Sequence, residues 1–149
     1  MVHFKKLGMY ETIQSVHSVL AYAALGLLLL ASINAISGLT SKKLFKSKDL
    51  RLSLFTLIIC HMQLLVGLIL YFVSPLGLEQ LGNMKDAAVR LTSLEHPLIN
   101  IIALVLITIG WSKHKKEESN NGKFKKIAVF YTLGLVLILS RLPWANWFN

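Results

Sequence analysis

Apolar residues gather in four long runs separated by polar stretches, and this pattern predicts four membrane-spanning helices. The runs cover about residues 13–37, 52–74, 94–112 and 125–142. A helix needs roughly 20 mostly apolar residues to cross a bilayer, and each run meets or nearly meets that length. We therefore expect an all-α, polytopic membrane protein with a single domain over residues 1–149.

The first run is also where a secretory signal peptide would lie. Lys5 and Lys6 precede it, and residues 31–35 resemble a small-residue cleavage site. However, the run is longer than the roughly 7–15 apolar residues of a signal-peptide core, and it contains Gln14 and His17. We expect a retained helix.

Basic residues predict the orientation, because Lys and Arg concentrate in cytoplasmic loops. Eleven of the 16 basic residues lie in the first and third connections: Lys42, Lys43, Lys46, Lys48, Arg51, Lys113, Lys115, Lys116, Lys123, Lys125 and Lys126. Both termini should face the periplasm, with an up-down-up-down bundle between short connections. The second connection, residues 75–92, has room for a short interfacial helix. Aromatic anchors are expected outside at Trp144, Trp147 and Phe148, and inside at Trp111.

The composition supports a membrane protein and argues against a nucleic-acid partner. Mean hydropathy is +0.59, and 54% of residues are apolar against 15% charged, with a net charge of +9. In a soluble protein such a charge would suggest nucleic acid. Here the basic residues flank apolar runs, where they contact anionic lipid headgroups of the bilayer. The single cysteine, Cys60, excludes a disulfide framework and a Cys-rich metal site.

Three histidines on three different predicted helices are the main candidates for chemistry. Ionisable residues in a span are costly and are functional candidates by default, and helix bundles build cofactor sites from inward-facing side chains. A buried interhelical hydrogen bond is the alternative for any one of them. The three are His17, His61 and His96, whereas His3 and His114 lie in flanking polar segments and are expected at the surface.

Depth along the helices pairs two of these histidines. At 1.5 Å rise per residue, His17 lies about 28 Å from the inner helix end, His96 about 22 Å and His61 about 14 Å. His17 and His96 also lie on parallel helices that can face each other across a bundle. Two imidazoles so placed are the axial iron ligands that a haem needs. A different task suits His61, such as tuning the haem or lining a quinone pocket.

Polar residues near this pair could complete a haem site. Asn100 lies one turn below His96 on the same face, and Arg141 has about the same depth as His96. Arg141 could pair with Glu95 or hold a haem propionate, and Arg90 is a second propionate candidate. The alternatives are snorkelling to headgroups for Arg141 and a helix N-terminal carboxylate for Glu95.

The second predicted helix carries a stripe of small and weakly polar residues. It is formed by Ser53, Thr56, Cys60, Gln63, Gly67, Tyr71 and Ser74. Such stripes usually mark helix–helix packing in membranes. His61 lies well over 90° from its centre, at about 100° per residue. Either His61 faces the bundle and the stripe receives another membrane subunit, or the reverse holds.

Other chemistry lacks its motifs. The chain has no glycine-rich phosphate loop, no Cys-x-x-Cys and no Cys-x-x-Cys-His, so a haem would be held noncovalently. His pairs at i,i+3 or i,i+4 are absent, and no group activates Ser18 or Cys60 as a nucleophile. We therefore favour an electron-transfer or accessory subunit over an independent enzyme.

Three strings resemble a known family: residues 61–75 (HMQLLVGLILYFVSP), Glu95-His96-Pro97 and Arg141-Leu142-Pro143-Trp144. The family comprises small four-helix bacterial membrane proteins commonly labelled cytochrome b or left uncharacterised. The resemblance covers nearly the whole chain and implies the fold, the bacterial inner membrane and a b-type haem. By position, the matching polar residues are His17, His61, Glu95, His96 and Arg141. One turn after His17, where the family often has a basic residue, this chain has Ala21.

Two hypotheses follow. The first is a haem b protein that relays electrons, as the anchor or a subunit of a respiratory or redox complex. The alternative is a cofactor-free accessory subunit of a larger membrane complex, with the histidines as buried hydrogen-bonding groups. A third reading, a proton path through Glu95, His96 and His61, is less favoured.

Overall fold

The computed structural model describes the backbone of residues 2–147 and the side chains of residues 8–146. All regular elements in this part of the chain are helical. The long helices are α1 (Val2–Thr40), α2 (Ser47–Val73), α4 (His96–His114) and α5 (Asn120–Ser140). The short ones are η1 (Leu78–Gln80), α3 (Ala87–Arg90), the π-helical turn η2 (Leu91–Glu95) and α6 (Trp144–Trp147).

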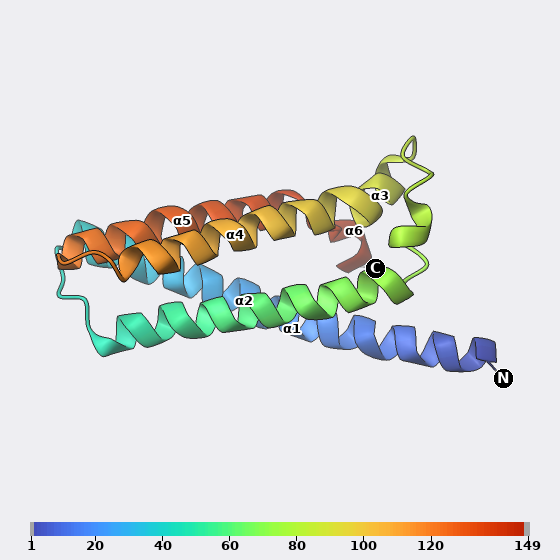
Figure 1. Cartoon of the computed structure of the whole chain (residues 1–149), viewed down its shortest axis with the longest axis horizontal. Coiled ribbons are helices and arrows are strands. Elements are labelled where there is room, and N and C mark those ends of the chain that lie inside the picture. The colour runs from blue at the N-terminus through green and yellow to red at the C-terminus, as the bar shows by residue number, and fades with distance from the viewer. Residues whose placement is uncertain (1, 148–149) are drawn as a thin grey trace.

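The four long helices lie side by side (Figure 1). α1 packs against α2 and α5, and α4 packs against α5 and α2. Residues 41–46 and 115–119 connect helices at one end of the molecule. At the other end lie α3, α6 and the start of α1 (Figure 1). The second connection, expected to have room for one short helix, contains two short helical elements, η1 and α3.

Three stretches are long and apolar enough to cross a membrane: Gly8–Thr40, Ser47–Val73 and Ala87–His114. They mark the chain as a membrane protein and correspond to the first three predicted spans. The fourth predicted span, 125–142, is not among them, because α5 begins at Asn120 and includes three lysines in its first two turns. The four-span bundle and its orientation stay predictions.

Two predictions about polar segments need correction. The third connection is expected from the sequence to be a solvated charged loop over Lys113–Lys126. In the structure it is confined to residues 115–119, and the Ser119 hydroxyl caps α5 by accepting from Gly122 N at 3.0 Å. His114 is not a surface residue, for its exposure is 2%. The rings of Phe45 and Trp111 cover it, at centroid distances of 5.7 and 4.5 Å. The side chains of His3 and Trp147, and all of Phe148, lie outside the described residues; Trp144 is exposed.

The core lies where α1, α4 and α5 meet α2. Leu28, Ile107 and Tyr131 are completely buried, and the Tyr131 hydroxyl donates to the main-chain carbonyl of Ser53 at 2.8 Å. α4 and α5 approach closely at Gly134, where a Cβ would lie 2.6 Å from Cγ1 of Ile107. Small residues at such crossings allow helices to pack closely in lipid, where no hydrophobic force drives them together.

The stripe on α2 faces the interior, which settles the choice between the stripe and His61. Ser53, Thr56 and Cys60 are buried. The rest of the stripe, from Gln63 to Ser74, lines the cavity described below. The chain's own helices therefore cover the first part of the stripe, and the second part borders the cavity. His61 is exposed on the opposite side of α2, where its Nδ1 lies 2.8 Å from the Leu57 carbonyl of its own helix.

Candidate functional site

The site begins at the junction of η2 and α4, which Pro97 shapes. Proline has no N–H, so the carbonyl four residues earlier loses its usual helical donor. That carbonyl belongs to Ser93, a residue with 1% exposure. The Tyr71 hydroxyl of α2 donates to it at 2.9 Å. In the preceding π-helical turn, His96 N bonds to Leu91 O. π turns occur frequently at functional sites.

The ring of His96 is held by the end of α5. Its Nδ1 lies 2.9 Å from the main-chain carbonyl of Arg141. The amide nitrogen of Asn100 also lies 3.2 Å from this Nδ1. The contact to Arg141 is shorter and a carbonyl only accepts, so we assign the proton to Nδ1 and the lone pair to Nε2. The Asn100 amide nitrogen donates to the main-chain carbonyl of His96 at 2.6 Å. Asn100 thus lies beside His96, as the sequence predicted, and Nε2 of His96 has the form of a metal ligand.

Two arginines bracket Glu95. Arg90 Nε lies 2.8 Å and Arg141 Nε 3.2 Å from its two carboxylate oxygens, and Arg90 also donates to the Met84 carbonyl at 3.0 Å. The predicted pairing of Arg141 with Glu95 is therefore confirmed. None of the three residues lines the cavity, so the propionate role predicted for Arg141 and Arg90 has no support in this arrangement.

The ring of His17 is held more loosely. Its Nε2 lies 3.4 Å from the amide nitrogen of Gln63, which also donates to the main-chain carbonyl of His17 at 3.0 Å. Its Nδ1 is buried and has no hydrogen-bond partner among the described residues. Gly67 provides room for the ring, since a Cβ there would lie 3.0 Å from Cε1 of His17.

His17 and His96 face each other with ring centroids 6.4 Å apart and planes at 86°. The proximity predicted from helix depth is confirmed; the ligand role stays a prediction. One iron bound by two imidazoles has each nitrogen about 2 Å away, which places the ring centroids about 6 Å apart. The observed separation matches that of two axial ligands sharing one metal, whereas Nε2 of His17 points toward the amide of Gln63.

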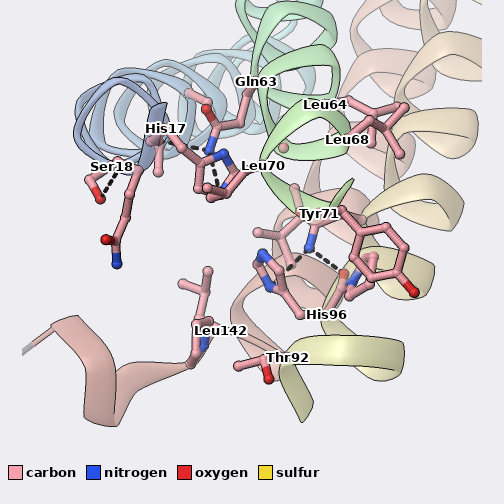
Figure 2. Close-up of a pocket in the computed structure, with 18 of the residues that line it drawn as sticks. His17, Ser18, Gln63, Leu64, Leu68, Leu70, Tyr71, Thr92, His96 and Leu142 are labelled. Atoms are coloured by element: carbon pink, nitrogen blue, oxygen red, sulfur yellow. Dashed lines mark hydrogen bonds between the residues drawn. The ribbon is translucent and has the colours of Figure 1, made fainter. Parts of the chain in front are cut away.

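A partly open cavity of about 200 Å³ adjoins the two rings (Figure 2). Figure 2 shows His17 beside Gln63 on one side and His96 nearer Tyr71 and Thr92 on the other. The lining of the cavity combines a few polar groups near the histidines with apolar side chains further along the helices: Leu25, Leu28, Leu64, Leu104 and Ile107. His61 is not part of this lining, so this cavity does not support the quinone role predicted for His61.

The donor set fits a haem better than a bare metal ion. Over the described residues, no group of three or more His, Cys, Asp or Glu side chains converges on a point, whereas a structural zinc takes four protein ligands. A haem brings four nitrogens of its own and needs only axial ligands. Ligand pockets usually exceed about 300 Å³, so the cavity of about 200 Å³ is smaller than a haem needs, and a haem would have to extend through its open side.

Sequence reasoning missed the roles of Gln63, Gly67 and Tyr71. All three belong to the stripe on α2 and line the cavity, so their 3–4 spacing was the available signal. The spacing defines a common face but not the direction in which that face points.

Comparison with models of known protein families, with curated proteins and with solved structures found no match. The site must therefore be interpreted from its own geometry.

Proposed function

We propose that this protein holds a b-type haem between His17 and His96 and relays electrons in the bacterial inner membrane. The observation that carries the proposal is the pair of imidazoles from α1 and α4, 6.4 Å apart beside a largely apolar cavity. A bound haem would exchange single electrons with a donor and an acceptor.

The residues around His17 and His96 have different roles in holding the haem. The Arg141 carbonyl keeps the proton of His96 on Nδ1 and so presents Nε2 as the ligand atom. Asn100 fixes the main chain at His96, and Tyr71 stabilises the adjoining turn. The apolar side chains of α1, α2 and α4 that line the cavity would keep a bound haem in a low-dielectric environment.

We further propose that α5 is a fourth span and that both termini face the periplasm. Fourteen residues separate Lys126 from Arg141, which is about 21 Å of helix, and snorkelling of both side chains extends that length. The support for the orientation is the concentration of lysines in and beside the two connections at one end of the molecule.

The test is the visible spectrum of the protein purified in mild detergent, first oxidised and then reduced. We expect a sharp Soret band that is lost in His17→Ala and in His96→Ala. His61→Ala should keep the band, because that ring faces away from the cavity. Full haem content in either of the first two variants would refute the assignment.

A second function, that of an accessory subunit of a larger membrane complex, is favoured by one observation. The His61 imidazole is exposed on the outward face of α2, and an ionisable side chain facing lipid calls for a partner. We propose that this face, with Ile58 and Leu65 beside it, contacts another subunit. His61→Leu should then reduce recovery of a partner of fixed stoichiometry, whereas recovery equal to wild type would exclude His61 from the contact.

A further inference from the structure

We propose that Gln63 is the positioning residue of His17, and that its amide orients this imidazole for iron. The inference rests on the proposed function, because it concerns how one of the two haem ligands is held. It assigns a task to a side chain of the α2 stripe that helix packing alone does not explain.

The Gln63 amide contacts both the main chain and the ring of His17. Its nitrogen donates to the His17 carbonyl at 3.0 Å and lies 3.4 Å from His17 Nε2. Gly67 lies one turn further along α2, and its lack of a side chain lets the ring lie against this helix. Two positions on one face of α2 therefore determine where the imidazole of α1 lies.

Two atoms in this contact are buried without a hydrogen-bond partner: Nδ1 of His17 and Oε1 of Gln63. They are complementary, since a protonated ring nitrogen donates and an amide oxygen accepts. An imidazole that binds a metal through Nε2 almost always donates its other N–H to a carbonyl, a carboxylate or water. A turn of the two side chains that joins these atoms satisfies both and frees Nε2 for iron.

The two proposed ligands then have different supports. His96 donates to a main-chain carbonyl, that of Arg141, which no substitution removes. In the turned arrangement, His17 donates to the Gln63 side chain, which substitutions can change. A stronger acceptor at Nδ1 increases the electron density of the imidazole, and this stabilises ferric over ferrous iron. The reduction potential therefore reports on the Gln63 contact itself rather than on folding.

The experiment is a redox titration of the full-length, haem-loaded protein carrying Gln63→Glu or Gln63→Leu. With a carboxylate as acceptor, we expect the preference for ferric haem to rise about tenfold, a negative shift of about 59 mV. Gln63→Leu removes the acceptor and should shift the potential in the positive direction. Met62→Leu is the control, because it changes an exposed side chain of the same helix that does not line the cavity.

The outcomes separate the two claims. Haem-loaded Gln63 variants with the wild-type potential overturn the role of Gln63 and leave the proposed function intact. A wild type that takes up no haem, even from added hemin, overturns the proposed function and the role of Gln63 with it. If Gln63→Glu fails to fold, Gln63→Asn replaces it: its amide is one methylene further from the ring, so a positive shift supports the assignment and an unchanged potential overturns it.

Discussion

The hydrogen bond from Tyr71 to Ser93 gives a sharp test of the structure at the His96 corner. Replacing Tyr71 with phenylalanine removes only the hydroxyl that donates to the Ser93 carbonyl at 2.9 Å. Interhelical hydrogen bonds in membrane proteins average about 0.6 and reach about 1.7 kcal/mol. Here the bond replaces an N–H that Pro97 lacks, and Ser93 is 1% exposed, so no solvent compensates. We expect a loss of about 1–2 kcal/mol in the free energy of unfolding.

A second substitution isolates the cause. Pro97→Ala restores an N–H that can donate to the Ser93 carbonyl within the helix. In that background, Tyr71→Phe should cost less than about half as much, which is a coupling of roughly 0.5–1 kcal/mol between two contacting sites. The assay is reversible unfolding in mixed micelles of a mild detergent and SDS, followed by far-UV circular dichroism. Equal costs in the two backgrounds would refute the proposed link between Pro97 and Tyr71.

Two further stability predictions use the same assay. Gly134→Ala should destabilise the protein by about 1–3 kcal/mol, because its Cβ would lie 2.6 Å from Ile107 Cγ1. In the control Gly26→Ala, the added Cβ meets nothing within 4 Å, so this variant should be neutral or stabilising by up to about 1 kcal/mol. Equal effects of the two substitutions would contradict the close packing at Gly134. Tyr131→Phe removes a completely buried hydrogen bond to the Ser53 carbonyl and should cost about 0.5–1.5 kcal/mol, whereas an unchanged midpoint would show that this bond contributes nothing.

Hydropathy and depth predict the scaffold and the central pair. Apolar run length identifies α1, α2 and α4, because a bilayer sets the length of a spanning helix. Depth counting brings His17 and His96 together, because the rise per residue is constant along a helix. Apolar run length predicts α5 less well, because this helix begins in the polar region with lysines in its first turns.

The periodicity of polar residues along α2 does not determine how the helix is rotated about its axis. It shows that His61 and the stripe point in different directions, but not which of them faces the bundle. The answer depends on packing against α1 and α4, which a single helix does not encode. The same holds for His114, whose burial depends on Phe45 from the connection between α1 and α2.

The most direct test of the central claim is the low-temperature electron paramagnetic resonance spectrum of the oxidised, purified protein. Two imidazoles on one iron predict a single low-spin ferric haem signal, with no high-spin component. A high-spin signal would show that one of the two rings is not a ligand. The absence of any haem signal from protein supplied with hemin would show that His17 and His96 meet for another reason.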